Sequence, residues 1–165
     1  MTNDDLFDTI AREHAAMIKR IAMSHEARSH LAEELVQEIY LAIWRALPSF
    51  RLDSSLRTFV ARIATNRSVS HVMRAVKLPL SVELDDQIPA TDGDPEHEAI
   101  IFDDQVTLVA AVQALPWSYR QVVVLALEGL APLEIAGVLG ISANAVAIRL
   151  TRAKGLMRKL LGDKS

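Results

Sequence analysis

Histidine and carboxylate side chains gather in the first quarter of the chain, a combination that can hold a metal ion. Di-metal helical bundles repeat a Glu-x-x-His motif on two helices, and this chain has no such pair. The chain also has no cysteine, no glycine-rich phosphate loop and no Gly-x-Ser-x-Gly nucleophile motif. We therefore expect no catalytic centre, metal or cofactor, and interpret the acids as a solvated helix face. The residues concerned are His25, Glu26, His30, Glu33, Glu34 and Glu38.

A cluster of basic residues lies near the carboxyl end of the chain. Residues 141–161 carry five cations and no acid. The overall net charge of −3 hides this cluster, because residues 77–114 carry one basic and nine acidic side chains. A basic helix can simply be a solvated packing helix, but cations at this density also attract the phosphates of nucleic acid. The five are Arg149, Arg152, Lys154, Arg158 and Lys159.

The residues before this cluster are typical of a helix-turn-helix motif. Pro132 suits the first turn of a helix, where its missing N–H costs nothing. Gly140 suits the left-handed turn that ends a helix, and Ser142 suits the cap of the next one. Two helices joined by a short glycine-containing turn form this motif. Ala131 replaces a hydroxyl cap, which we expect to cost about 1 kcal/mol of local stability.

The second helix of the motif has two distinct faces when it is projected at about 100° per residue. Val146, Leu150, Ala153 and Met157 form an apolar, buried stripe. A helix that enters the DNA major groove needs short polar groups near its start and cations beside them. The opposite face supplies both, with Asn144, Ile148, Thr151, Arg152 and Lys159 outward and Ala147 and Arg158 at the sides.

The chain is predicted to be all-α, with two small helical domains joined by an acidic flexible linker. The linker, residues 77–95, contains three prolines and a glycine and has too little apolar content to pack alone. It separates a domain over residues 1–76 from one over residues 96–165. Apolar residues at three- and four-residue steps predict the helices. These run from Leu6 to Ile21, from Glu26 to Leu47 before Pro48, from a Ser54 or Ser55 cap to Val76, and from Glu96 to Leu115, with Val122–Val124 in a further buried helix.

Two parts of the chain resemble regions of a known protein family. Residues 34–47, Phe50-Arg51 and residues 55–66 resemble region 2 of sigma-70-type factors, and residues 115–154 resemble region 4. Both regions in this order, without regions 1 and 3, resemble the extracytoplasmic-function (group 4) subfamily. The resemblance implies an alternative sigma factor that binds RNA polymerase core and directs promoter recognition and DNA melting.

The resemblance also implies a role for each matching surface. One helix would dock on the clamp helices of the polymerase β′ subunit, where exposed acids beside an apolar stripe suit a basic coiled coil; Trp44 and Tyr40 can instead be core residues. The β flap is a further expected contact. The docking residues are Glu34, Leu35, Gln37, Glu38, Tyr40, Leu41, Trp44 and Arg45.

The promoter contacts implied by the resemblance fall on two segments. Six arginines and one acid lie after Trp44 and up to Arg74, which suits single-stranded DNA. The family places an unpaired base between the loop after Phe50 and the following helix, where Asn66 would bond its edge. The −10 contacts would be Phe50, Arg51, Arg57, Arg62, Asn66, Arg67 and Arg74, and the −35 contacts Ser142, Asn144, Ala147, Ile148, Arg149, Arg152, Lys154 and Arg158.

One alternative function stays open at this point. A helix-turn-helix domain also occurs in autonomous regulators that bind operator DNA without polymerase. No apolar run reaches the roughly 18 residues of a membrane span, so we expect no membrane insertion and a cytoplasmic location. By resemblance alone, an anti-sigma factor is a possible partner.

Overall fold

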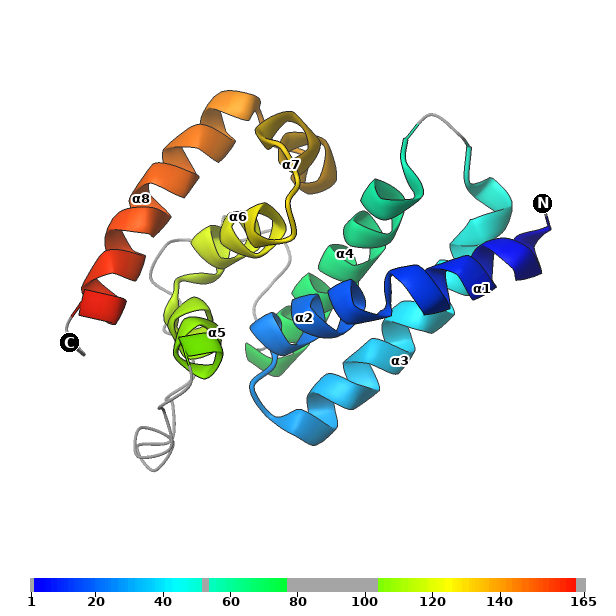
Figure 1. Cartoon of the computed structure of the whole chain (residues 1–165), viewed down its shortest axis with the longest axis horizontal. Helices are drawn as coiled ribbons and strands as arrows, with labels where there is room; N and C mark the ends of the chain where they lie inside the picture. Colours follow the sequence, from blue (N-terminus) through cyan, green and yellow to red (C-terminus); the bar gives the residue numbers. More distant parts are fainter. Residues whose placement is uncertain (1, 52–53, 77–103, 163–165) are drawn as a thin grey trace. The chain divides into compact units, whose positions relative to one another are not determined.

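The computed structural model describes residues 2–51, 54–76 and 104–162. Within these ranges the chain forms α-helices, one short 3-10 helix and no strand, which confirms the predicted all-α class (Figure 1). The helices are α1 Asn3–Glu13, α2 Ala15–His25, α3 Ser29–Ala46, η1 Leu47–Ser49, α4 Leu56–Val76, α5 Asp104–Ala114, α6 Trp117–Leu127, α7 Pro132–Leu139 and α8 Ala143–Gly162.

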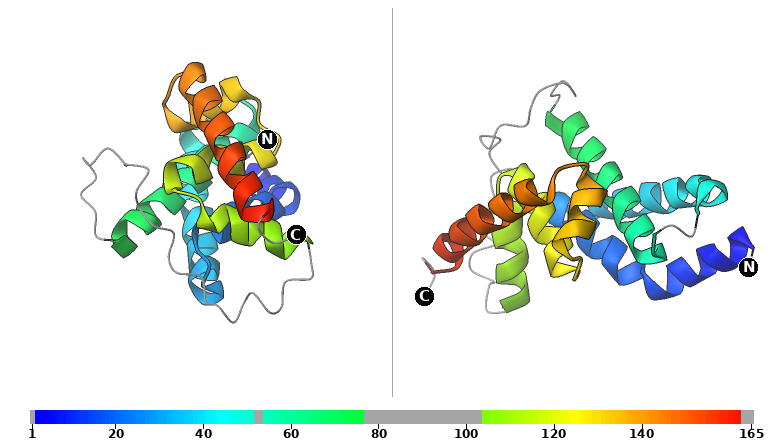
Figure 2. Two further views of the ribbon diagram at one scale, coloured as in Figure 1. Left: turned by 90° about the vertical axis from the view of Figure 1, so that its left-hand side faces the viewer. Right: turned by 90° about the horizontal axis from the view of Figure 1, so that it is seen from above.

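The chain divides into two compact units. The first contains α1 to α4, and the second contains α5, α6, α8 and most of α7 (Figures 1 and 2). The predicted linker, residues 77–95, lies outside the described residues, so the predicted domain boundaries stay a prediction.

The first predicted helix is wrong in one respect, because two helices replace it. α1 ends at Glu13 and α2 begins at Ala15, with His14 between them at φ −118° and ψ 5°. The helical pattern of backbone hydrogen bonds continues through the break. The His14 N–H donates to the Ile10 carbonyl, and the His14 carbonyl accepts from the Ile18 N–H. A kink that keeps these bonds leaves the apolar spacing intact, which is why the sequence pattern did not show it.

The core of the first unit lies where α2, α3 and α4 pack against one another. Small buried residues on α4, among them Ala61, Ala64 and Ser68, let the neighbouring helices approach closely. Burying each large aliphatic side chain contributes about 1.5–3 kcal/mol. The fully buried ones are Ile10, Ile18, Ile21, Leu35, Ile39, Ile43, Leu47 and Val60.

The passage from α3 to α4 follows the sequence signals closely. Pro48 lies within η1, directly after α3 ends at Ala46. The Ser55 hydroxyl accepts from the Thr58 N–H at 3.1 Å, so Ser55 caps α4. The cap satisfies a backbone donor that the first turn of a helix leaves without an intrahelical partner.

In the second unit, α6 is the buried helix that the Val122–Val124 run predicts. Every residue from Trp117 to Leu125 is buried. One of them is Arg120, whose Nη2 donates to the Leu115 carbonyl at 2.9 Å, at the end of α5. Burial lowers the pKa of Arg120 to about 10. This value is still well above neutral pH, so the guanidinium stays charged. Arg120 therefore fixes the turn between α5 and α6.

Two glycines with positive φ follow α6 and α7 and begin the turns after them. Gly129 has φ 84° after α6, and Gly140 has φ 69° after α7. In both turns the next residue donates back across the glycine, Leu130 to Leu125 at 3.1 Å and Ile141 to Ala136 at 3.2 Å. This is the hydrogen bond of a Schellman motif, in which the left-handed residue is usually glycine. The role predicted for Gly140 is confirmed.

Candidate functional site

The helix-turn-helix has the geometry that its sequence predicts. The chain bends by 105° between α7 and α8, within the roughly 90–120° of this motif. Pro132 is the first residue of α7, and the Ser142 hydroxyl accepts from Ala145 N–H at 3.0 Å at the start of α8. The loss of local stability predicted for Ala131, which lacks a capping hydroxyl, is partly offset because its N–H donates to the Glu134 carboxylate at 2.9 Å. This is one half of a capping box.

The outward face of α8 is open to solvent as predicted. Of the predicted buried stripe, Val146 and Ala153 are fully buried, whereas Leu150 and Met157 are half-buried. Ile148 is 43% exposed. An exposed isoleucine between polar residues suits a thymine methyl group in the major groove. Arg149 is half-buried, and the other residues proposed for the −35 contact are exposed: Ser142, Asn144, Ala147, Arg152, Lys154 and Arg158.

The cations proposed for the −10 contact follow α4 and the segment before it. Phe50, half-buried, packs on Phe59 with ring centroids 4.6 Å apart, which anchors the start of this segment to α4. Residues 52 and 53 lie outside the described ranges. The remaining proposed contacts are all exposed: Arg51, Arg57, Arg62, Asn66, Arg67 and Arg74.

Asn66 lines a hollow in the first unit with a volume of about 390 Å³. The lining residues come from α3 and α4: Ala42, Ile63, Asn66, Arg67 and Ser70. The family resemblance placed a base pocket between the loop after Phe50 and α4, so the observed hollow lies further along α4 than expected. An amide beside a cation and apolar walls can bond the edge of a flat polar ring and stack on its face.

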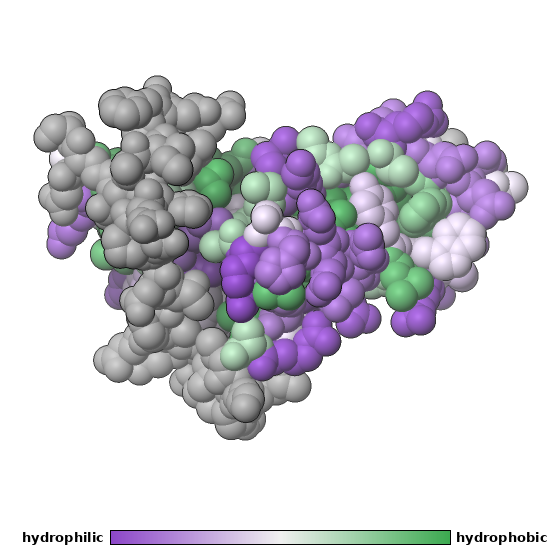
Figure 3. Space-filling view, turned by 90° about the horizontal axis from the view of Figure 1, so that it is seen from below, coloured by the Kyte–Doolittle hydropathy of each residue, from purple (hydrophilic) through white to green (hydrophobic). Residues whose placement is uncertain are grey.

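The outer face of α3 carries most of the residues proposed for docking. Leu41 is 49% exposed and Trp44 is 44% exposed, and Glu34, Gln37 and Arg45 are exposed. The prediction for Leu35 is wrong, because this residue is fully buried on the opposite, core-facing side of α3. The helix on which all these residues lie is the lowest one in the view of Figure 1. In Figure 3, seen from below, apolar and hydrophilic residues are interspersed on this side of the molecule.

An ion pair joins a residue proposed for docking to a residue proposed for the −10 contact. Arg74 Nη2 on α4 lies 3.1 Å from the Glu38 carboxylate on α3; the Arg74 side chain is largely exposed and that of Glu38 about half exposed. Such a surface pair contributes about 0–1 kcal/mol. The family resemblance implies different surfaces for the two residues, but the structure brings them together because α3 packs on α4.

The aromatic side chains Tyr40 and Trp44 of α3 contact Phe7, a residue outside the predicted surfaces. The Phe7 ring on α1 lies 5.4 Å from Trp44 at an interplanar angle of 85°, and 6.0 Å from Tyr40 at 67°. Both are edge-to-face arrangements, which aromatic pairs prefer. Tyr40 and Trp44 are four residues apart and so share a face of α3. No sequence signal ties Phe7 to them.

A buried carboxylate ties the loop between α2 and α3 to α4. Glu26 is 7% exposed, and its carboxylate lies 2.9 Å from His71 Nε2 and 2.8 Å from Arg28 Nη2. It also accepts from the Arg28 N–H at 2.9 Å. Burial raises the pKa of Glu26, but the hydrogen bonds from Arg28 and His71 outweigh it and lower the pKa from 4.5 to about 2. Glu26 is therefore ionised, and its place in the fold is that of a structural clamp.

Replacing this carboxylate should destabilise the first unit in a pH-dependent way. We expect Glu26→Gln to lower the free energy of unfolding by about 1.5–3 kcal/mol at pH 7, since bonds to a charged group are lost. A carboxyl with a lowered folded-state pKa contributes stability above its unfolded pKa and loses it as the pH falls. The difference between the variant and the original chain should therefore shrink between pH 4.5 and about 2.

Urea unfolding followed by circular dichroism at pH 7 and at pH 3 measures this difference. Glu38→Gln is the matched control, because it removes a carboxylate from an exposed ion pair and should change stability by at most about 1 kcal/mol. Equal losses in both variants, or a Glu26→Gln loss that is the same at both pH values, would contradict the structural role.

Comparison with known families matches both units in the order described. The model of Sigma-70 region 2 matches residues 10–77, and that of Sigma-70, region 4 matches residues 105–157. The ECF RNA polymerase sigma factor SigE of Mycolicibacterium smegmatis is 30% identical over 165 aligned residues, which cover 96% of this chain and 63% of SigE. The chain belongs to the sigma-70 family, among its extracytoplasmic-function sigma factors.

Further relatives and solved structures agree with this membership. The sigma factor SigW of Bacillus subtilis is 27% identical, with 98% of this chain and 91% of SigW covered. The structure of CnrH in complex with the cytosolic domain of CnrY matches with a TM-score of 0.69 and 25% identity, over 99% of this chain and 92% of that one. The sigma factor RpoE of Bartonella quintana, solved with the anti-sigma factor NepR, shares the fold with a TM-score of 0.72, 21% identity and 98% of both chains covered.

Two facts set the extent of the comparison. This sigma factor spans less than two thirds of the length of SigE, but most of the length of SigW. In the described part of the chain no single helix is long and apolar enough to cross a membrane, and only α7 and α8 taken together, across their 105° bend, reach that length and composition.

Proposed function

We propose that the chain is an alternative sigma factor, which binds RNA polymerase core in the cytoplasm and directs it to promoters without catalysing a reaction itself. The observation that carries this proposal is the pairing of two different surfaces in one chain. One unit holds a helix-turn-helix with a basic, exposed face, and the other holds an acidic and aromatic helix face beside a cationic helix. An autonomous regulator needs only the first.

Each of three helices has its own role in the proposed function. α8 enters the major groove of the −35 element, with Asn144 and Arg152 toward base edges and Lys154 and Arg158 toward phosphates. α4 binds the melted −10 element through its exposed arginines and the hollow at Asn66. α3 docks on the β′ clamp helices through Trp44, with its exposed acids facing the partner's cations.

An inhibitory partner belongs to the same proposal. The solved structures of CnrH and of RpoE both contain a second protein, the cytosolic domain of CnrY and the anti-sigma factor NepR. We propose that an anti-sigma factor also regulates this chain. Such a protein would have to cover α3, α4 or α8, because these helices carry the exposed surfaces that polymerase and DNA need.

A gel-shift and transcription series with and without polymerase core tests the function. We expect the free protein to bind promoter duplex poorly and core to restore sequence-selective binding, with transcript starts that appear only in the reconstituted holoenzyme. The acidic residues 77–114 give the chain a local net charge of −8 that opposes binding of free DNA. Tight, selective binding of a duplex by the protein alone would instead show an autonomous regulator.

A further inference from the structure

The amino-terminal helix contributes an aromatic ring to the exposed face of α3. Phe7 holds the Trp44 indole edge-on, at a centroid distance of 5.4 Å and an angle of 85°, while 44% of Trp44 stays exposed. Phe7 also contacts Tyr40, so one ring braces two neighbouring side chains of α3. The match to Sigma-70 region 2 begins at residue 10, so Phe7 lies before it.

The beginning of α1 is built to stay in place beside α3. Thr2 and Asp5 form a complete capping box, in which the Thr2 hydroxyl accepts from Asp5 N–H and the Asp5 carboxylate accepts from Thr2 N–H, both at 3.1 Å. Backbone hydrogen bonding satisfied in this way favours a defined helix start. α1 contacts η1 and α3, and α1 and α3 run in opposite directions (Figure 1). Phe7 is thus presented from an ordered helix.

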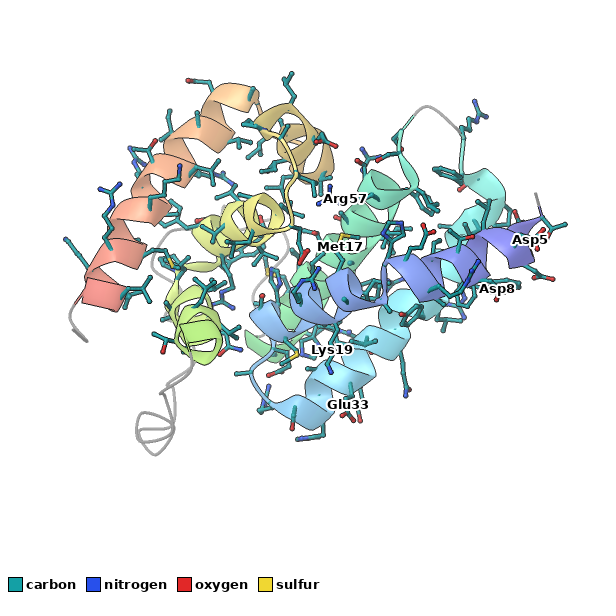
Figure 4. All side chains as sticks on the ribbon, viewed as in Figure 1. Asp5, Asp8, Met17, Lys19, Glu33 and Arg57 are labelled. Carbon is teal, nitrogen blue, oxygen red and sulfur yellow. The ribbon has the colours of Figure 1, made fainter. Side chains whose placement is uncertain are left out.

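Acidic residues outnumber the cations, Arg12 and Arg45, on the two helices that carry the aromatic cluster. Asp4, Asp5 and Asp8 are exposed on the first turns of α1, and Glu33 and Glu34 are exposed near the start of α3. Figure 4 shows Asp5 and Asp8 near one end of the α1–α3 pair and Glu33 near the other. An exposed aromatic residue with acids on both sides suits a partner surface on which basic and apolar residues alternate, such as that of a cationic helix.

We propose that α1 is part of the polymerase-docking surface, with Phe7 as the positioning residue for Trp44. The inference rests on the proposed function, because it deepens the docking assigned to α3. A large side chain held in one orientation before binding loses less freedom when the partner arrives. Phe7 therefore raises the affinity for core by fixing the Trp44 indole in its exposed orientation, and the α1 acids extend the charged rim of the same surface.

The test is a double-mutant cycle on core binding with the full chain. Phe7→Leu keeps an apolar side chain but removes the edge-to-face contact, and we expect it to weaken binding to purified core by roughly 3- to 10-fold. In a Trp44→Ala background the same substitution should have little further effect, because Phe7 acts through Trp44. Phe7→Tyr, which keeps the ring, should restore the binding.

A control and a spectroscopic signal separate positioning from folding. Phe59→Leu breaks the other aromatic pair of this unit, with Phe50, and should leave core binding unchanged. The chain has two tryptophans, Trp44 and Trp117, so fluorotryptophan labelling gives two 19F resonances. Phe7→Leu should move the Trp44 resonance and leave that of Trp117 in place.

The possible outcomes distinguish this inference from the function on which it rests. Unchanged core binding by Phe7→Leu, or an equal loss with and without Trp44, overturns the positioning role while the docking surface on α3 stands. If Trp44→Ala itself leaves core binding unchanged, the docking surface is misplaced and the inference falls with it. A loss in Phe7→Leu that vanishes in the Trp44→Ala background supports both.

Discussion

Reversing two acids on α3, by Glu34→Lys with Glu38→Lys, should weaken binding to polymerase core by about 2–5 kcal/mol. Both side chains lie on the outer part of α3, where a basic coiled coil would meet them. The reversal removes two favourable charges and adds two repulsive ones. Surface plasmon resonance with immobilised core measures the affinity, and the association rate should fall and depend on ionic strength.

The structure shows how this experiment must be controlled. Glu38 pairs with Arg74, so its reversal also places two cations side by side. Arg74→Ala breaks that ion pair but leaves the acids of α3 in place, and it should bind core as the original chain does. Glu13→Lys, on the exposed last turn of α1 and apart from Asp4, Asp5 and Asp8, controls for a charge reversal as such, with half the change in net charge. If the double reversal binds core as tightly as these controls, α3 is not the docking surface.

Local signals predicted the ends of helices better than the joints within them. Ser55, Gly140 and Ser142 each act through their own backbone or a neighbour three residues away, so a single sequence contains the whole interaction. The break at His14 carries no proline or glycine and leaves the apolar spacing unchanged. A pattern of spacing cannot show a kink that does not disturb the spacing.

The sequence predicts a candidate surface where one helix forms it, because a projection of that helix then shows which residues share a face. It does not predict contacts between side chains of two different helices. The projection of α8 gave its exposed face correctly, but only Val146 and Ala153 of its predicted buried stripe are buried. The spacing of apolar residues also predicts that Leu35 lies on the core side of α3. Leu35 is fully buried, so this spacing is a better guide to its position than the family resemblance, which implied a docking role. The pairs Glu26–His71 and Glu38–Arg74 join residues 45 and 36 positions apart, so they depend on how α4 packs.

Alanine substitutions on α8 should separate residues that read the −35 element from residues that hold its phosphates. Asn144 and Arg152 lie on the exposed outer face of α8, where an amide can pair with adenine and a guanidinium with guanine. Lys154 and Arg158 are exposed as well, and their charges suit the DNA backbone. Alanine at the first pair should cost about 1–3 kcal/mol per residue at the preferred site only.

Alanine at the second pair should weaken binding to every sequence and lower the slope of affinity against salt by about one ion per cation removed. The measurement is holoenzyme binding to promoters that differ at single −35 positions, at two or more salt concentrations. Thr151→Ala is the matched control on the same face, because its hydroxyl already donates its proton to the Ala147 carbonyl at 3.0 Å and so has none left for a phosphate oxygen. A uniform loss across all promoters for Arg152→Ala would make it a phosphate contact, and Asn144 would then be the base-reading residue left on that face.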